Sequence, residues 1–421
     1  MYHRAVIEPP PPTFEDVRNL LSQNCVICHV EKGPAPFELT QVEDYRKRSS
    51  FIGSLIQEDR MPPHLSQKDR WTDLEKSLVL QWLQAISSND QHKSVPIPDP
   101  PKFRADQTFV TPKGFTIPSE GGERWHQGDR DIRTFRLAPR VEKTLRVQAW
   151  RFESTAQREV ESVALVHDDG TVARYGDLQE PETPGYEMTG DMGLRPAGFL
   201  GVLGIGNPTF RIPTGYHFEV PESHEIDFEL RFRPSGLARA FSATLDAELV
   251  PQDHLSRALQ LVPLSIRSWR ANAGESGTIH RIWKSPISMD VPLLSVRAGR
   301  RVKDVTLKVD DRVVFQIHDW DPHWQQTWET TNLRVAKNAK LEAIFTVDNS
   351  DQNPRNPETP PKDIQFGRRT GALGVWLHAA ACEPDETSSL QILRRQMFTA
   401  LQTDGVMSPE QTTPGQSVLP N

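Results

Sequence analysis

The sequence predicts a multidomain chain in which a small all-α domain precedes a tandem pair of all-β sandwiches. Three observations lead to this fold class. The chain has 421 residues, which allows two to four domains. Apolar residues recur at helical spacing between residues 14 and 86, whereas short runs of β-branched and aromatic residues fill much of residues 144–347. A polar, proline-rich stretch separates the two patterns and predicts a stiff linker over residues 91–104.

The composition excludes two classes of function. The chain has 49 Lys and Arg against 56 Asp and Glu, a net charge of -7, which argues against a binder of nucleic-acid phosphates. No apolar run approaches the roughly 18 to 20 residues that a membrane-spanning helix needs. We therefore expect neither nucleic-acid binding nor a transmembrane segment in this chain.

Three helices are expected in the first domain, which we place at residues 10–90. The pattern over residues 14–23 puts its apolar side chains on one face, and residues 42–57 form a second helix. Thr72 and Glu75 have the spacing of a capping box, which predicts a third helix that runs to residue 86.

The strongest motif lies at the end of the first of these helices. Cys25 and Cys28 are followed directly by His29, and this C-x-x-C-H pattern is the attachment signature of c-type haem. Two thiols one helical turn apart can add to the two vinyl groups of one porphyrin, and the adjacent imidazole then reaches the iron. The alternatives are half of a zinc site or a redox-active thiol pair. Zinc would need two more ligands, and Cys382 is the only other thiol; a thioredoxin-like pair would need a βαβ context, which the sequence lacks. Three helices around one haem c predict a small cytochrome c domain.

A second axial ligand is expected from the segment that follows the second helix. We predict Met61, because two prolines follow it and would hold the loop extended while it presents the thioether to the iron. His64, three residues further on, is the competing ligand.

The rest of the chain is expected to be β structure. The pair Asp310 and Asp311 separates two alternating runs and predicts a hairpin turn. The length of this part suffices for two sandwiches, which we place at residues 105–262 and 263–383. Residues 384–421 predict a short amphipathic helix, centred on residues 388–401, and a disordered tail.

Several longer motifs carry a resemblance to a known family. They are CVICH at 25–29 with PAPF at 34–37, RMPP at 60–63, RPSG at 233–236, DWDPHWQQT at 319–327 and VDNSDQNPRNP at 347–357. To about residue 383, the chain resembles bacterial proteins that join a cytochrome c domain to a module similar to copper type II ascorbate-dependent monooxygenases, the class that contains peptidylglycine hydroxylating enzymes. The resemblance implies that both sandwiches are jelly-roll-like.

The copper ligands of that family do not carry over to this chain. The family binds one copper through an adjacent His-His pair and a third His, and the other through H-x-H and a Met. The corresponding positions here are Glu161, Ser162, Arg231, residues 294–296 and Gly374. Because these side chains offer no imidazole or thioether donor, copper is not expected. A new metal site would need scattered histidines to converge in space; these are His217, His224, His280 and His378.

A haem with protein ligands on both faces has no open position for a substrate, so its natural role is to pass single electrons. We therefore expect an extracytoplasmic c-type cytochrome whose β half is a scaffold or docking module for a redox partner; the sequence leaves open whether the chain is also an enzyme, and the missing copper ligands argue against monooxygenase activity. The first alternative is a copper-dependent monooxygenase with a non-standard copper site fed by the haem. The second is a structural subunit of a periplasmic assembly.

The expected location is outside the cytoplasm, because haem of this kind is attached on the outer side of the cytoplasmic membrane. Residues 1–9 lack the apolar core of a signal peptide. We therefore expect the given sequence to begin downstream of a removed signal or anchor.

Overall fold

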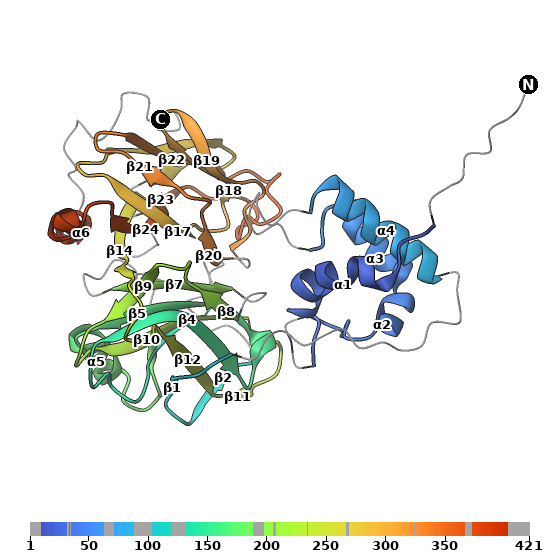
Figure 1. Cartoon of the computed structure of the whole chain (residues 1–421), viewed down its shortest axis with the longest axis horizontal. Coiled ribbons are helices and arrows are strands. Elements are labelled where there is room, and N and C mark those ends of the chain that lie inside the picture. Colours follow the sequence, from blue (N-terminus) through green and yellow to red (C-terminus); the bar gives the residue numbers. More distant parts are fainter. Residues whose placement is uncertain are drawn as a thin grey trace, which may run out of the picture. The chain divides into compact units, whose positions relative to one another are not determined.

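A computed structural model describes residues 10–402, except 32, 34, 63–70, 88–102, 120–130, 188–197, 205–207, 234, 267–268, 323–324 and 367–372. The chain divides into two compact units, Met1–Lys102 and Phe103–Asn421 (Figure 1). Most of the predicted linker at residues 91–104 and the predicted tail after residue 402 lie outside the described residues.

The first unit is built from helices: α1 (Phe14–Leu21), the π-turn η1 (Ser22–Val26), α2 (Val42–Arg46), α3 (Ser49–Gln57) and α4 (Asp73–Ser87). The predicted capping box at the start of α4 is confirmed. The backbone N–H of Thr72 donates to the Glu75 carboxylate at 2.8 Å, and the Glu75 N–H donates to Thr72 Oγ1 at 3.2 Å.

The helices of the first unit share one apolar core. Spacings of three and four residues place its side chains on facing stripes of the helices. The buried members are Val17, Leu21, Val26, Leu39, Val42, Tyr45, Ile52, Ile56, Val79, Trp82, Leu83 and Ile86. Trp82 lies at the centre of this core, where its ring packs edge-on against Tyr45 with the centroids 5.5 Å apart.

The predicted fold class, a small all-α cytochrome c domain followed by all-β sandwiches, is wrong as a description of the chain. The structure is mostly β, with 42% strand and 21% helix, and a small all-α cytochrome domain is not evident in it. Two of the helices, α5 (Thr171–Gln179) and α6 (Thr387–Gln402), belong to the second unit. The spacing over residues 42–57 predicted one continuous helix. Instead the backbone leaves helical geometry at Arg48, with φ −125° and ψ 13°, and this divides the segment into α2 and α3.

The β sandwiches, by contrast, fit the structure. One sheet of the first sandwich has the order β1-β12-β4-β9-β13, with β8 paired to β4, and the other has the order β6-β3-β10-β5-β7. The strands of the first sheet are β1 (Gln107–Val110), β4 (Leu145–Ser154), β8 (Thr209–Arg211), β9 (Tyr216–Val220), β12 (Ala243–Leu249) and β13 (Arg257–Ala258). Those of the second are β3 (Asp131–Arg136), β5 (Val160–Asp168), β6 (Tyr186–Glu187), β7 (Phe199–Gly204) and β10 (Glu225–Phe232). A short pair, β2 (Phe115–Ile117) and β11 (Arg239–Phe241), adds to them. Alternate side chains from both sheets, such as Trp150 on β4 and Phe228 on β10, meet in one core.

The second sandwich follows without a break. One sheet has the order β14-β24-β17-β20, with β21 paired to β17, and the other has the order β16-β22-β18-β19. The strands of the first are β14 (Gln260–Ile266), β17 (Met289–Arg297), β20 (Thr327–Glu329), β21 (Arg334–Val335) and β24 (Leu373–Ala381). Those of the second are β16 (Ser276–Lys284), β18 (Val302–Val309), β19 (Arg312–Ile317) and β22 (Lys340–Asp348), and β15 (Trp269–Ala271) pairs with β23 (Ile364–Phe366). The finer domain boundaries and the jelly-roll topology stay predictions.

The hairpin predicted at Asp310 and Asp311 is confirmed. These two residues connect β18 to β19, and both have positive φ, 47° and 65°. Two successive residues of positive φ match the right-handed twist of the flanking strands, and aspartate tolerates this conformation better than most residues.

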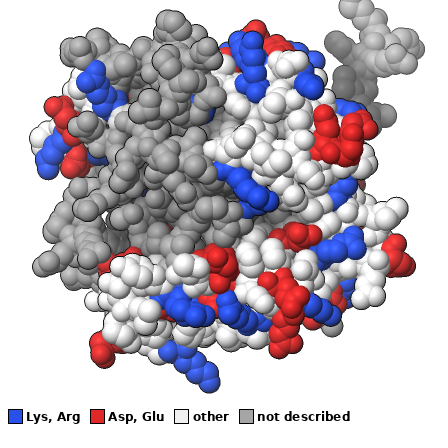
Figure 2. Space-filling model, turned by 90° about the vertical axis from the view of Figure 1, so that its left-hand side faces the viewer, with Lys and Arg blue, Asp and Glu red and all other residues white. Residues whose placement is uncertain are grey.

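The C-terminal helix also follows the sequence pattern. Leu390 of α6 is buried in the core of the second sandwich, with Leu393 and Met397 packed beside it. Of the helices that the structure describes, none is both long and apolar enough to cross a membrane. On the described part of the face in Figure 2, acidic and basic side chains are interspersed, without an extended area of one sign.

Candidate haem site

The attachment motif lies where α1 passes into the π-turn. Cys25 is part of η1, and the N–H groups of Cys28 and His29 both donate to the Cys25 carbonyl, at 3.2 and 3.0 Å. Buried Val17 and Leu21 fix α1 against the core, so the turn that follows it is fixed as well. The structure therefore brings the two predicted thiols and the predicted imidazole together on one turn of backbone.

The orientation of His29 is set by a backbone carbonyl. Its Nδ1 lies 2.8 Å from the carbonyl oxygen of Phe37, and the two rings are 4.7 Å apart. A carbonyl only accepts, so Nδ1 carries the proton and Nε2 keeps its lone pair. Among the described residues, Nε2 has no hydrogen-bond partner. Burial, together with the nearby charge of Arg48, holds the pKa of His29 below its ordinary value despite the bond to Phe37. A neutral imidazole held through its second nitrogen is the form that ligates a metal.

Both cysteine sulfurs are free and neutral. Burial raises the pKa of Cys25 to about 12 and that of Cys28 to about 11. The hydroxyl of Tyr45 interacts with the Cys25 sulfur and opposes part of this rise. Redox-active pairs need surroundings that lower the pKa of a thiol. A thioether sulfur carries no charge, so burial imposes no desolvation penalty on a charged form of it.

The loop after His29 folds back onto the attachment turn. Ala35 donates its N–H to the Cys28 carbonyl at 3.3 Å, and Leu39 donates to the His29 carbonyl at 2.8 Å. Gly33 lies so close to the Cys28 carbonyl oxygen that a Cβ atom there would overlap with it. The close approach requires glycine, and it allows Phe37 to reach His29.

Met61 lies in the turn that follows α3, which ends at Gln57. The N–H groups of Arg60 and Met61 both donate to the Leu55 carbonyl of α3, at 2.8 and 3.2 Å, and Met61 is half-buried. No contact among those of the described residues joins Met61 to His29, so its role as axial ligand stays a prediction. The competing ligand, His64, lies outside the described residues.

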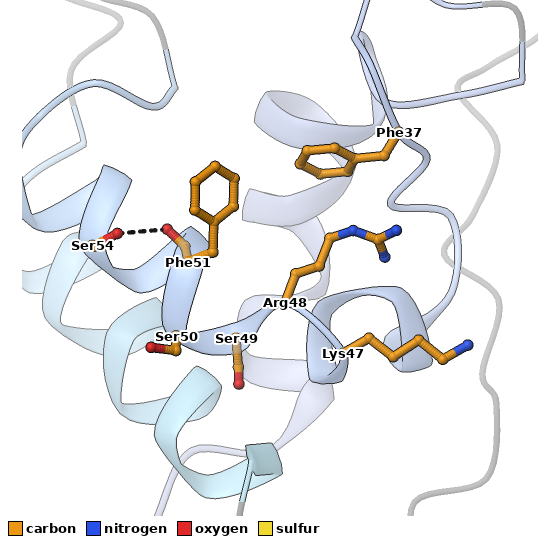
Figure 3. A pocket seen from close by; sticks show the side chains of 7 residues that line it. All are labelled: Phe37, Lys47, Arg48, Ser49, Ser50, Phe51 and Ser54. Atoms are coloured by element: carbon orange, nitrogen blue, oxygen red, sulfur yellow. Dashed lines mark hydrogen bonds between the residues drawn. The ribbon is translucent and has the colours of Figure 1, made fainter.

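A hollow of about 520 Å³ opens in the same unit (Figure 3). Its lining comes from the loop after His29 and from the bend and first turns around α3: Phe37, Lys47, Arg48, Ser49, Ser50, Phe51 and Ser54. The volume lies in the range of about 300–1,000 Å³ that is typical of cofactor sites. Phe37 connects the hollow to His29, because its ring lines the hollow and its carbonyl orients the imidazole. Neither the two thiols nor His29 belongs to the lining of this hollow. The two thiols and the oriented imidazole on one turn are the features that fit a covalently attached haem.

In the β unit, packed side chains occupy the positions at which the resemblance implies copper ligands. Glu161 and Ser162 on β5 are buried, and Arg231 on β10 pairs with Ser162 in register. Val296 is buried on β17, and a Cβ at Gly374 would lie 2.6 Å from Trp376 Nε1. Within the described residues, no group of three or more His, Cys, Asp or Glu is arranged to hold a metal ion.

The four scattered histidines do not converge. His217 bonds to Ser256 and His280 to Glu342, both at 2.8 Å, and His378 lies 3.1 Å from Ser295 Oγ. His224 faces His167, with the two Nδ1 atoms 2.9 Å apart. His167 was not predicted, and no local pattern marks it, since the pairing of β5 with β10 alone brings the two rings together.

Comparisons with known proteins leave the family open. No family model matches the chain, and no curated protein matches it. Among solved structures, it is similar to the major capsid protein P2 of bacteriophage PM2, with 8% identity over 66% of this chain and 99% of that chain and a TM-score of 0.26. It is also similar to a protein of the T13 IBDV viral particle, with 9% identity over 86% of this chain and 99% of that chain and a TM-score of 0.14. At such TM-scores neither likeness carries an argument.

Proposed function

We propose that this protein is an extracytoplasmic c-type cytochrome that carries one haem, bound covalently through Cys25 and Cys28, and transfers single electrons. The observation that carries the proposal is the state of the attachment turn. Two neutral thiols and an imidazole share that turn; the imidazole Nε2 has no hydrogen-bond partner among the described residues, and a backbone carbonyl holds Nδ1.

Each residue of the turn has a distinct task in this proposal. Cys25 and Cys28 anchor the porphyrin as thioethers, and His29 is the proximal ligand of the iron. Phe37 fixes the tautomer and the direction of that imidazole through its carbonyl. Met61 is proposed as the second ligand, and a thioether there raises the reduction potential. When bound, the haem supplies an iron that exchanges one electron at a time and has no open position for a substrate.

The two other interpretations of the motif have less support. A redox-active pair needs a thiolate, and burial raises the pKa of both thiols, which disfavours that form. A zinc site needs four ligands, and within the described residues no group of three or more His, Cys, Asp or Glu is arranged to hold a metal ion. The thioether interpretation needs no charge on either sulfur, so it is compatible with the buried surroundings of both cysteines.

For the β unit we propose the role of a scaffold or docking module. The positions that hold copper in the resembled monooxygenases carry carboxylate, hydroxyl, guanidinium and apolar groups, none of which is a usual ligand of copper. A redox partner and an extracytoplasmic location belong to the same proposal, since attachment of haem c takes place outside the cytoplasm.

Cysteine variants of the full chain, expressed with a c-type haem maturation system, test the proposal. After denaturation and solvent extraction, wild-type chains should keep about one haem each, and C25A/C28A should keep none. C382S is the matched control, because Cys382 is the third thiol and lies in the other unit; it should retain haem like the wild type. Wild-type chains without covalent haem, or equal retention in C25A/C28A, would contradict the proposal.

A further inference from the structure

Tyr45 carries a hydroxyl group inside the core of the first unit. The residue lies on α2 and is completely buried, and its ring packs edge-on against Trp82 with the centroids 5.5 Å apart. Among the described residues, the hydroxyl oxygen has no hydrogen-bond partner. A buried hydroxyl has given up its bonds to water, and this costs free energy unless a protein group or a ligand replaces them. The hydroxyl therefore points to a partner that the working form of the protein supplies.

The sulfur of Cys25 is the polar group that lies beside this hydroxyl. Cys25 packs against the same core as Tyr45. Burial raises the pKa of Tyr45, and the neighbouring Cys25 sulfur adds to the rise. In return, the hydroxyl offsets part of the effect of burial on the pKa of Cys25. At Cys28, burial alone raises the pKa. The two sulfurs of the attachment turn therefore have different surroundings.

Attachment to haem changes what the Cys25 sulfur can do in a hydrogen bond. In this step the S–H bond breaks, the sulfur binds the inner carbon of a vinyl group, and the hydrogen goes to the outer carbon, so no oxidant or reductant is consumed. A thiol is a weak donor as well as a weak acceptor, whereas a thioether sulfur can only accept. The attached sulfur therefore matches the Tyr45 hydroxyl, a donor that has no partner among the described residues.

We propose that Tyr45 is a positioning residue, whose hydroxyl donates to the Cys25 sulfur and holds that sulfur in place during attachment. This inference rests on the proposed function. The contact with Trp82 fixes the ring of Tyr45, so the hydroxyl has a defined position relative to the attachment turn. A donor at this position also stabilises the sulfur while its S–H bond breaks. Because the hydroxyl acts on Cys25 and burial alone acts on Cys28, the hydroxyl should assist one attachment and not the other.

Haem-free full-length chains that keep one cysteine of the motif test this assignment. C28A can attach haem only through Cys25, and C25A only through Cys28. Each purified chain is mixed with ferrous haem under reducing conditions, and the covalent adduct is followed over time by mass spectrometry of the denatured protein. Y45F removes the hydroxyl and keeps the ring that packs against Trp82. Loss of one hydrogen bond should slow attachment about fivefold in C28A/Y45F relative to C28A. C25A/Y45F should attach haem at the rate of C25A.

The C25A pair is the matched control, because damage to the packing of the core would slow attachment through either cysteine. Equal slowing in both pairs, or slowing in neither, would overturn the role of the hydroxyl and leave the proposed function standing. The same holds if C28A takes up no haem while the wild type does, or if the wild type attaches haem only with the maturation system, since Tyr45 can hold the sulfur only in the folded chain. A wild type that carries no covalent haem even after maturation overturns both.

Discussion

His378 should make the β unit sensitive to acid. The residue lies on β24, completely buried between the two neighbouring strands β14 and β17. Its ring stacks on Phe199 with the centroids 5.7 Å apart, Nε2 lies 3.1 Å from Ser295 Oγ, and Nδ1 is buried without a partner. Burial lowers the pKa of His378 from 6.5 to about 3. The folded protein therefore holds this imidazole neutral at a pH where the unfolded chain protonates it.

The sign and size of the effect follow from this difference. Below pH 6.5 the unfolded state binds more protons at this site than the folded state. The free energy of unfolding therefore decreases as the pH is lowered from about 6.5 to about 3. Each pH unit of the window corresponds to about 1.4 kcal/mol, so His378 alone should cost about 3 kcal/mol at pH 4. His167, with a pKa of about 3, and His217, with a pKa of about 4, act in the same direction.

Urea unfolding of H378F at pH 7 and at pH 4, followed by tryptophan fluorescence, measures this contribution. Phenylalanine keeps the stack on Phe199, and Ser295 Oγ keeps Thr327 Oγ1 as a partner at 2.8 Å. Between the two pH values, H378F should lose about 3 kcal/mol less stability than the wild type. H254F, at an exposed histidine of the same unit, should lose as much as the wild type. An equal loss in H378F and the wild type would refute the reasoning.

Three further predictions concern the attachment turn, the axial ligand and the ion pair within the β unit. G33A should strongly reduce covalent haem loading, because its methyl group would overlap with a carbonyl of the attachment turn. G53A is the control and should load normally, because the nearest atom to its methyl group would be 3.9 Å away. Equal loading in the two variants would contradict the role of the loop. M61A should remove the weak sulfur-to-iron band of the oxidised protein and lower its potential, and an unchanged spectrum would exclude Met61 as ligand. E229Q weakens the buried ion pair in which Arg297 lies 2.7 Å from Glu229. The free energy of unfolding, measured in urea, should therefore fall by about 3 kcal/mol. An unchanged free energy of unfolding would show that the pair contributes little.

Local patterns of the sequence predicted local structure well. The capping box of Thr72 and Glu75 and the hairpin at Asp310 and Asp311 depend on residues close together in the chain, and both are present. The break at Arg48 was not predicted, because spacing alone does not show where a helix changes direction. The fold class was wrong as a description of the whole chain, which is mostly β, although the helices follow the apolar spacing of residues 14–86 and 388–401.

At the candidate site, too, local sequence patterns predict some features, whereas others depend on the fold. The motif of Cys25, Cys28 and His29 identifies the chemistry by residue type and spacing alone. The acceptor that orients His29 is a backbone carbonyl, at Phe37, and any residue type carries one, so no sequence pattern could have marked it. Tyr45 was missed for a related reason, because only the fold brings its hydroxyl beside the Cys25 sulfur.

The most direct measurement is the mass of the peptide that contains residues 24–29, released by proteolysis from denatured full-length protein made with a haem maturation system. The account predicts that this peptide carries one haem on its two cysteines and that no other peptide carries haem. A peptide of unmodified mass from fully matured protein would contradict it.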